Sequence, residues 1–315
     1  MKQFRGSFPV IVTPFRAGDG AFDEDAMRRF VDWQIEQGSH GLVTLGSMGE
    51  FYLVSDEDRT RIVTAVVEQA AGRVPVLVGT MNVRNETAVR YSREAEELGA
   101  DGLMITPPYY VAPTDDEIFD YYRAICDEVS VPVMLYNNPF TTNVDMSAEL
   151  VGRLTRELEN VRYIKEASGD LARVYDVRRE AGPKMNIWQG ARPFEAFFLG
   201  SNGWVSPEGN WVPAASAEMY NRLFAGDTAG AEKIRDTFVA MVTLIRSAAP
   251  APRRNNLAVM TAFAKELCRM VGQPMGVPRP PMKPAEAYGE RGARVLAQVR
   301  DIVDEMGVIA AQAAE

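Results

Sequence analysis

The sequence predicts an α/β protein, a (β/α)8 TIM barrel with a C-terminal helical extension. Short apolar runs, typical of strands buried on both faces, alternate with helical patterns eight times. A barrel of this kind takes about 250 residues. The 315-residue chain therefore leaves room for a helical appendage. An open, doubly wound sheet would need a nucleotide-binding fingerprint or a reversal of strand order, and neither is visible.

The expected strands are β-branched or apolar almost throughout, as is usual for strands that helices cover on both faces. They are expected at residues 9–15, 41–46, 74–80, 102–108, 131–138, 163–168, 186–190 and 203–206. In a barrel, the residues at the carboxyl ends of these strands form the functional site.

Helix signals lie between the strands. Residues 22–25 open a helix that stops at Gly38, and Ser55 opens a second helix with acidic residues in its first turn. Acidic residues at that end complement the helix dipole. Further helices are expected over residues 85–99 and from Thr114 onward.

Beyond the last expected strand the pattern is helical. Helices are expected at residues 214–224, 228–246, 257–271 and 284–311, and proline-containing segments separate the last three. The first of them completes the barrel. We therefore expect a catalytic barrel over residues 1–225 and a C-terminal helical domain over residues 226–315.

Composition narrows the class of function. The net charge of -9 argues against nucleic acid or an acidic membrane surface as a partner, and no apolar run approaches the length of a membrane span. The amino terminus leads into a strand without the apolar region of a signal peptide. Cys126 and Cys268 both lie in helical patterns. A cytoplasmic protein without disulfides is expected.

Residue counts also exclude several kinds of chemistry. His40 is the only histidine, and it precedes a strand instead of following one, which is the wrong end for a serine hydrolase triad. One histidine and two separate cysteines make no transition-metal site, so no metal is expected. Neither a GxGxxG nor a P-loop pattern follows a strand. The remaining candidates are lysine, tyrosine, serine and carboxylate side chains.

Lys165 is the strongest candidate, because it stands in a segment that otherwise reads as a buried strand. Burial disfavours the charged amine, which lowers its pKa and makes it a nucleophile toward carbonyl groups. Tyr136 ends the preceding expected strand and could move the protons that imine chemistry requires. The alternative is a lysine that extends to the rim and pairs with a carboxylate.

Other strand ends add possible substrate contacts. Ser47 and Met48 stand between two glycines, which allow a tight turn with exposed amides, suited to a carboxylate. An ordinary strand-to-helix turn is the alternative. Strand alternation places Asn138 on the same face as Tyr136, whereas Glu166 faces the helices and is a poor catalytic candidate. Asn138 could contact substrate or cap a loop.

These motifs resemble the dihydrodipicolinate synthase and N-acetylneuraminate lyase family. The resemblance extends from Phe8 to about Val303 and rests on segments 46–50, 109–110, 136–139, 164–170 and 279–281. Members of that family are (β/α)8 barrels with a C-terminal helical domain, usually tetramers. They join a lysine to the keto group of pyruvate or another 2-oxo acid, with no cofactor beyond this imine.

The resemblance implies roles for individual residues. Lys165 would form the Schiff base, Tyr136 would shuttle protons, and Ser47 with the Met48 amide would hold the carboxylate. Tyr110 would reach across a subunit interface toward the shuttle tyrosine, which implies a homodimer or homotetramer. The catalytic set is thus Lys165, Tyr136, Ser47 and Tyr110. The expected substrate contacts are Ser47, Met48, Asn138, Thr141 and Val205.

Two departures from the family pattern bear on the substrate. Met48 replaces a residue that usually carries a hydroxyl, and Thr141 stands where dihydrodipicolinate synthases carry an arginine for a second carboxylate. We therefore expect a Schiff-base lyase for pyruvate or a hydroxylated 2-oxo acid, working as an aldolase or as a dehydratase or deaminase. The alternatives are dihydrodipicolinate synthase itself and a barrel that binds a 2-oxo acid without catalysis.

Overall fold

The computed structural model describes residues 4–249 and 256–307. Within them the eight strands form one sheet in the order β1-β8-β7-β6-β5-β4-β3-β2. Adjacent strands in the sheet are therefore consecutive in the sequence, except that β1 lies beside β8. The Ser7 carbonyl accepts a hydrogen bond from the His40 amide just before β2 at 3.2 Å. The sheet is thus a nearly closed parallel barrel, as the sequence predicts.

By its contacts the chain forms two compact units. The first comprises residues up to Phe8, His40–Val43 and Gly72–Val205. Its strands are β1 (Gly6–Pro9), β2 (Leu42–Thr44), β3 (Val76–Gly79), β4 (Gly102–Ile105), β5 (Val133–Asn137), β6 (Val161–Glu166), β7 (Asn186–Gln189) and β8 (Gly203–Ser206); the last residues of β1, β2 and β8 belong to the second unit. Its helices are α3 (Asn85–Glu97), α4 (Asp115–Cys126), α5 (Pro139–Thr142), α6 (Ala148–Glu157), α7 (Ala172–Ala181) and α8 (Pro193–Phe197), and η2 (Gly182–Lys184) is a 3-10 turn.

The second unit comprises residues Pro9–Ser39, Thr44–Ala71 and the chain from Ser206 onward. Its elements are α1 (Glu24–Glu36), η1 (Phe51–Leu53), α2 (Asp56–Ala70), η3 (Glu208–Asn210), α9 (Pro213–Phe224), α10 (Thr228–Ser247), α11 (Leu257–Met270), η4 (Ala285–Tyr288) and α12 (Gly289–Glu305). Helix α10 packs against α9 and α12, so the C-terminal helices share one core.

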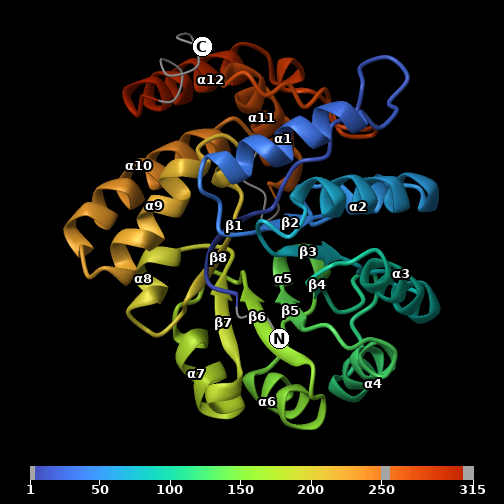
Figure 1. Ribbon diagram of the computed structural model, residues 1–315. Coiled ribbons are helices and arrows are strands. Elements are labelled where there is room, and N and C mark those ends of the chain that lie inside the picture. Colours follow the sequence, from blue (N-terminus) through green and yellow to red (C-terminus); the bar gives the residue numbers. More distant parts are fainter. Residues whose placement is uncertain (1–3, 250–255, 308–315) are drawn as a thin grey trace. The chain divides into compact units, whose positions relative to one another are not determined.

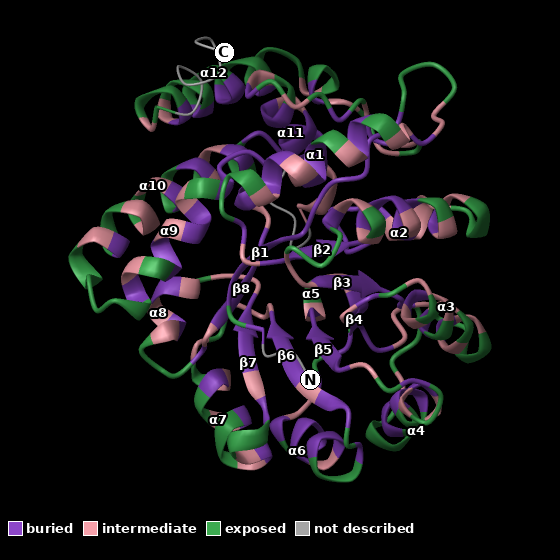
Figure 2. Ribbon diagram, in the orientation of Figure 1, coloured by how far each residue is buried: buried purple, intermediate pink, exposed green. Residues whose placement is uncertain are grey.

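Helices α3, α4, α6 and α7 run along the outside of strands β3 to β7 (Figure 1). The strands are buried almost throughout, and these helices bury only the side that faces the sheet (Figure 2). Residues at the strands' carboxyl ends are thereby held by a rigid scaffold, which is the usual place for a barrel's functional groups.

The expected helix starts are confirmed by side-chain caps. Asp23 accepts a hydrogen bond from the Ala26 amide, and Ser55 accepts one from the Asp58 amide. Thr114 and Glu117 form a complete capping box at the start of α4. Each cap satisfies amides that the first turn of a helix leaves without partners.

The first strand was predicted wrongly at 9–15, because β1 covers Gly6–Pro9. The residues after Pro9 are apolar and buried, but the Val12 amide donates to the Asn210 side chain at 2.9 Å, outside any ladder. Burial in a connecting segment thus imitates a strand in the sequence, since both need apolar residues.

The last predicted helix, 284–311, is also shorter and interrupted. A 3-10 turn, η4, precedes α12, and Gly289, the first residue of α12, has a φ of 61° that separates the helix from this turn. Residues from 308 onward lie outside the described part of the chain. In the described ranges, no helix is both long and apolar enough to cross a bilayer.

Candidate active site

Lys165 and Tyr136 lie side by side on neighbouring strands. They are register partners in the parallel pair β5–β6, and each is only 4% exposed. The Lys165 Nζ lies 3.9 Å from the centroid of the Tyr136 ring. Contact with the ring face is favourable for an ammonium group. The pair places an amine and a phenol in one buried environment.

The Tyr136 hydroxyl is oriented by Asn138. The side-chain amide of Asn138 donates a hydrogen bond to the Tyr136 hydroxyl oxygen at 2.9 Å, and both residues are buried. A phenol can donate one hydrogen bond and accept others. The phenolic proton therefore remains available for another partner. In this arrangement Asn138 positions the phenol, a role that the sequence did not suggest.

The carbonyl of Asn138 organises the short helix α5. It accepts hydrogen bonds from the amides of Thr141 and Thr142, and their hydroxyls also donate to it at 3.3 and 2.9 Å. Thr142 Oγ1 additionally contacts the Val144 carbonyl at 3.0 Å. The polar groups that follow β5 are thus neutral.

A buried ionic network supports this strand pair on its outward face. Glu166 is 1% exposed and accepts hydrogen bonds from the Asn137 side chain, the Ser168 amide and Arg173 Nε, the last at 2.9 Å. Asn137 Oδ1 accepts from the Met146 amide, and the Arg173 guanidinium donates to the Met146 carbonyl. Glu166 faces outward as alternation predicts, and it connects β5, β6, α7 and the segment after α5.

Gly190, directly after β7, leaves space for the lysine side chain. A Cβ at this position would lie 3.1 Å from Lys165 Cε and 2.8 Å from the Ala167 Cβ. A larger residue would therefore force a shift of Ala167 and crowd the Lys165 side chain. Sequence reasoning missed Gly190, although a glycine at a strand end beside a lysine strand is the signal that could have indicated a close approach.

The loop after β2, residues 46–50, belongs to the second unit. Residues 47–50 form a turn, and the left-handed backbone angles occur at Leu45 and Glu50, with φ values of 53° and 57°, and not at Gly46 or Gly49. Gly49 instead permits close packing, because a Cβ there would lie 3.1 Å from the Leu45 nitrogen and 3.2 Å from the Ile11 carbonyl. Left-handed conformations at non-glycine residues persist only where surroundings enforce them.

Within this loop the two candidate residues differ. Ser47 is 9% exposed, and its carbonyl accepts the Glu50 amide at 3.2 Å. The Met48 side chain is buried, with its sulfur 3.8 Å from the Thr261 hydroxyl of α11. The Met48 side chain therefore serves packing, and only its backbone amide can bind an anion.

Tyr110 and Val205 complete the predicted set. Tyr110 is 90% exposed in the loop after β4, whereas Val205 is fully buried in β8. Such exposure excludes Tyr110 from the buried surroundings of Tyr136 within one protomer. The structure thus brings together Lys165, Tyr136 and Asn138, with Thr141 in the adjoining α5.

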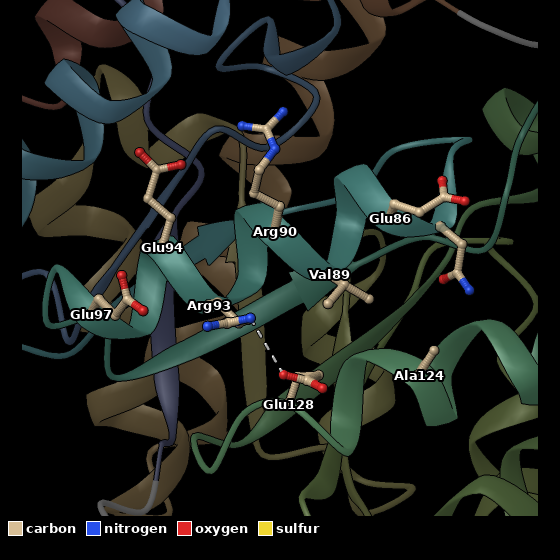
Figure 3. Close-up of a pocket in the computed structure, with 9 residues that line it drawn as sticks. Glu86, Val89, Arg90, Arg93, Glu94, Glu97, Ala124 and Glu128 are labelled. Carbon is tan, nitrogen blue, oxygen red and sulfur yellow. Dashed lines mark ion pairs between the residues drawn. The ribbon is translucent and has the colours of Figure 1, made fainter.

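A surface groove between α3 and α4 is a different kind of feature (Figure 3). Its charged residues come from α3, including Glu86, Arg90 and Glu94, and from the turn after α4, where Glu128 pairs with Arg93 at 3.7 Å. It contains no residue from a strand end. The described residues contain no group of three histidine, cysteine or carboxylate side chains arranged for a metal ion.

A parallel barrel with a buried lysine facing a tyrosine on the next strand defines a class of protein, the class I lyases that work through a Schiff base. Residues 3–298 match the Dihydrodipicolinate synthetase family. The chain belongs to this family, and it is an enzyme of the class I lyase type.

Individual relatives agree with this assignment. The 4-hydroxy-tetrahydrodipicolinate synthase of Methylobacterium radiotolerans is 37% identical over 84% of this chain and 89% of its own length. The enzyme of the same name from Nitratidesulfovibrio vulgaris strain Miyazaki F is 32% identical over 98% of this chain and all of its own. YagE, a prophage protein of the family from E. coli K12 solved in complex with pyruvate, superimposes with a TM-score of 0.87 at 28% identity, covering 96% and 99% of the two chains.

Proposed function

We propose that this protein is a lyase in which Lys165 forms an imine with pyruvate or a hydroxylated 2-oxo acid. The observation that carries the proposal is the buried Lys165 amine, 3.9 Å from the ring centroid of Tyr136 on the adjacent strand. The relative that was solved with pyruvate supports the substrate class. The reaction needs no cofactor, because the imine itself withdraws electrons.

In the proposed reaction the uncharged Lys165 amine attacks C2 of the 2-oxo acid. The Tyr136 hydroxyl gives one proton to the carbinolamine oxygen and the nitrogen gives the second, so water leaves and an iminium remains beside the Tyr136 phenolate, which can then accept the C3 proton. The resulting iminium acidifies C3. Loss of a C3 proton gives an enamine, which either attacks an aldehyde carbon or expels a C4 hydroxyl as water. Hydrolysis then restores the free lysine.

The carboxylate is assigned to the loop after β2. The Ser47 hydroxyl and the Met48 backbone amide are the donors, since the Met48 thioether has no hydrogen to donate and accepts from Thr261. Two neutral groups, Asn138 beside Tyr136 and Thr141 beside the Asn138 carbonyl, are assigned to hydroxyl groups further along the substrate. Val205 contributes from β8 as an apolar contact.

The imine is tested by trapping. Incubation with pyruvate and sodium borohydride, followed by digestion and mass mapping, should place the added mass on Lys165. The buried Lys265 serves as an internal control, because it is occupied by an ion pair and should remain unlabelled. Label on another lysine, or no label with any 2-oxo acid, would contradict the proposal.

A second candidate is dihydrodipicolinate synthase itself, which the names of the relatives favour. Against it stands Thr141, whose hydroxyl donates to the Asn138 carbonyl and cannot replace a charge-assisted arginine pair. The deciding measurement is kcat/KM for pyruvate with aspartate semialdehyde against a panel of hydroxylated 2-oxo acids and cyclic imines. We expect the panel to give the larger value.

If the semialdehyde is preferred, another cation must bind its carboxylate. Arg192 is the first candidate, because it is exposed at the start of α8. Arg192→Ala would then lower kcat/KM for the semialdehyde specifically. A barrel that only binds 2-oxo acids would be recognised by ligand binding without turnover of any member of the panel.

A further inference from the structure

One face of α11 contacts the loops that follow β2 and β8. Thr261, Lys265 and Cys268 are spaced four and three residues apart, which places them on one side of the helix. Thr261 contacts Met48, as described above. The Lys265 Nζ lies 2.6 Å from Glu50 Oε1, and the Cys268 thiol donates to the Asn210 carbonyl at 3.3 Å. All three side chains are buried.

Lys265 is the central contact on this face. Its side chain is 1% exposed and its partner Glu50 is fully buried. Besides Glu50, its ammonium donates to the Val277 carbonyl at 2.8 Å and lies 4.7 Å from the centroid of the Phe15 ring. Burial lowers the pKa of Lys265 by more than the Glu50 carboxylate raises it, so the pKa lies below its usual value. A buried ion is tolerated where it is paired and hydrogen-bonded in this way.

The second carboxylate oxygen of Glu50 also accepts a hydrogen bond. This oxygen, Oε2, accepts the backbone amide of Arg279 at 2.8 Å. The Arg279 guanidinium donates to the Leu53 carbonyl at 3.2 Å and to Asp58 at 2.5 Å, and it stacks 3.9 Å from the Phe15 ring centroid. The segment that contains Val277 and Arg279 therefore fixes both the carboxylate and the backbone just after it.

These contacts enforce the left-handed backbone of Glu50, with its φ of 57°. Without Lys265 the carboxylate would be an unpaired buried charge, which is expensive enough to move the side chain or admit water. The turn formed by Ser47 and Glu50 would then lose its support, because Glu50 provides both the anchor and the strained residue.

We propose that the Lys265–Glu50 ion pair positions the 46–50 loop so that Ser47 and the Met48 amide can bind the substrate carboxylate, an inference that rests on the proposed function. Lys265 never touches the substrate in this scheme, so it is a positioning residue. The C-terminal helices would thereby set the affinity for the 2-oxo acid, while Lys165 and Tyr136 perform the chemistry.

The test measures how strongly pyruvate binds, separately from turnover. Borohydride inactivation is followed at graded pyruvate concentrations in wild type, Lys265→Met and Glu50→Gln. We expect the half-saturating concentration to rise about tenfold in Lys265→Met, as for the loss of one good hydrogen bond to a charged ligand. The limiting rate at saturation should change far less. Glu50→Gln keeps an acceptor for the Arg279 amide and should show a smaller rise.

Controls separate positioning from general destabilisation. Phe263→Leu alters another buried side of α11, against Tyr288, and should lower the melting temperature without changing half-saturation. Glu232→Gln removes an exposed ion pair with Arg235 and should change neither quantity. If Lys265→Met does not fold, Glu50→Gln decides alone. If a folded Lys265→Met or Glu50→Gln variant needs the same half-saturating pyruvate concentration as wild type, the inference is overturned.

Failure of the proposed function gives a different result. If wild type traps no 2-oxo acid, the imine proposal fails, and amide hydrogen exchange in residues 46–50 then decides the positioning role. Faster exchange in Lys265→Met than in Phe263→Leu supports the ion pair as the support of the loop. Equal exchange in the two variants refutes it.

Discussion

The Tyr136 hydroxyl is the group whose removal most directly tests the chemistry. Tyr136→Phe should lower kcat by about 10² to 10⁴, the usual contribution of a general acid–base group. Because the Lys165 amine remains in place, borohydride trapping should stay measurable. Steady-state kinetics and trapping on the same preparation check both statements. A phenylalanine variant with nearly normal kcat would exclude the shuttle role.

Asn138→Leu is the companion variant. It removes the hydrogen bond to the Tyr136 hydroxyl, 2.9 Å in length, while preserving much of the side-chain volume. If Asn138 orients the phenol, kcat should fall about tenfold while half-saturation by pyruvate in trapping stays close to wild type. A rise in half-saturation with unchanged kcat would instead support the substrate contact that the sequence suggests.

Glu208 is a buried carboxyl group that the proposed reaction does not use. Burial raises its pKa from 4.5 to about 7, and its Oε2 has no hydrogen-bond partner within the described residues. The group is neutral at low pH, so its stabilising contribution is complete below about pH 4.5 and is lost as the pH rises through about 7.

Glu208→Gln should therefore flatten the pH dependence of stability. Above pH 8 the variant should be more stable than wild type by up to about 3 kcal/mol, and near pH 4.5 the difference should disappear. Denaturant unfolding at several pH values measures this gap. Parallel curves for the two proteins would show that the carboxyl group titrates normally.

At the scale of elements, the outward faces of β5 and β6 depend on α7 through Arg173 and Glu166. Arg173→Met should leave Glu166 buried without its cation and destabilise the protein by about 3 kcal/mol. Arg179→Met on the same helix removes only exposed ion pairs, with Asp176 and Glu180, and should cost less than about 0.5 kcal/mol. Equal effects in denaturant unfolding would contradict the network's importance.

At the scale of the whole molecule, exposed apolar side chains follow two neighbouring strands. Tyr110 and Val111 after β4 are 90% and 63% exposed, and Phe140 after β5 is 46% exposed. Aromatic residues of this kind are enriched at protein interfaces. We propose that they contact a second copy of the chain in a homodimer or homotetramer.

Tyr110→Ala should then weaken assembly about 30-fold or more, as truncation of an interface hot spot does. Light scattering over a dilution series measures the change, with Val239→Ala, an exposed residue on α10, as the control. A wild-type chain that is monomeric and active at assay concentration would refute the interface.

Much of the fold could be read from the sequence because its signals are local. Strand burial needs continuous apolar runs, and helix starts need capping residues such as Ser55 and Thr114. The limits of this reasoning appear at residues 10–15, where burial in a connection resembles a strand. They appear again near Gly289, where one backbone angle divides an expected helix into η4 and α12.

In the candidate site, too, some residues were predictable from the sequence and others only from the tertiary structure. The sequence alone predicted Lys165 and Tyr136 as candidates, because a lysine is unusual in an apolar strand and the tyrosine ends the neighbouring strand. Only the tertiary structure shows that Asn138 orients the phenol, that Gly190 makes room for the lysine, and that Lys265 pairs with Glu50. Those contacts join residues that are distant in sequence or depend on side-chain direction. Local propensity carries no information about them, since they arise when packing brings separate elements together.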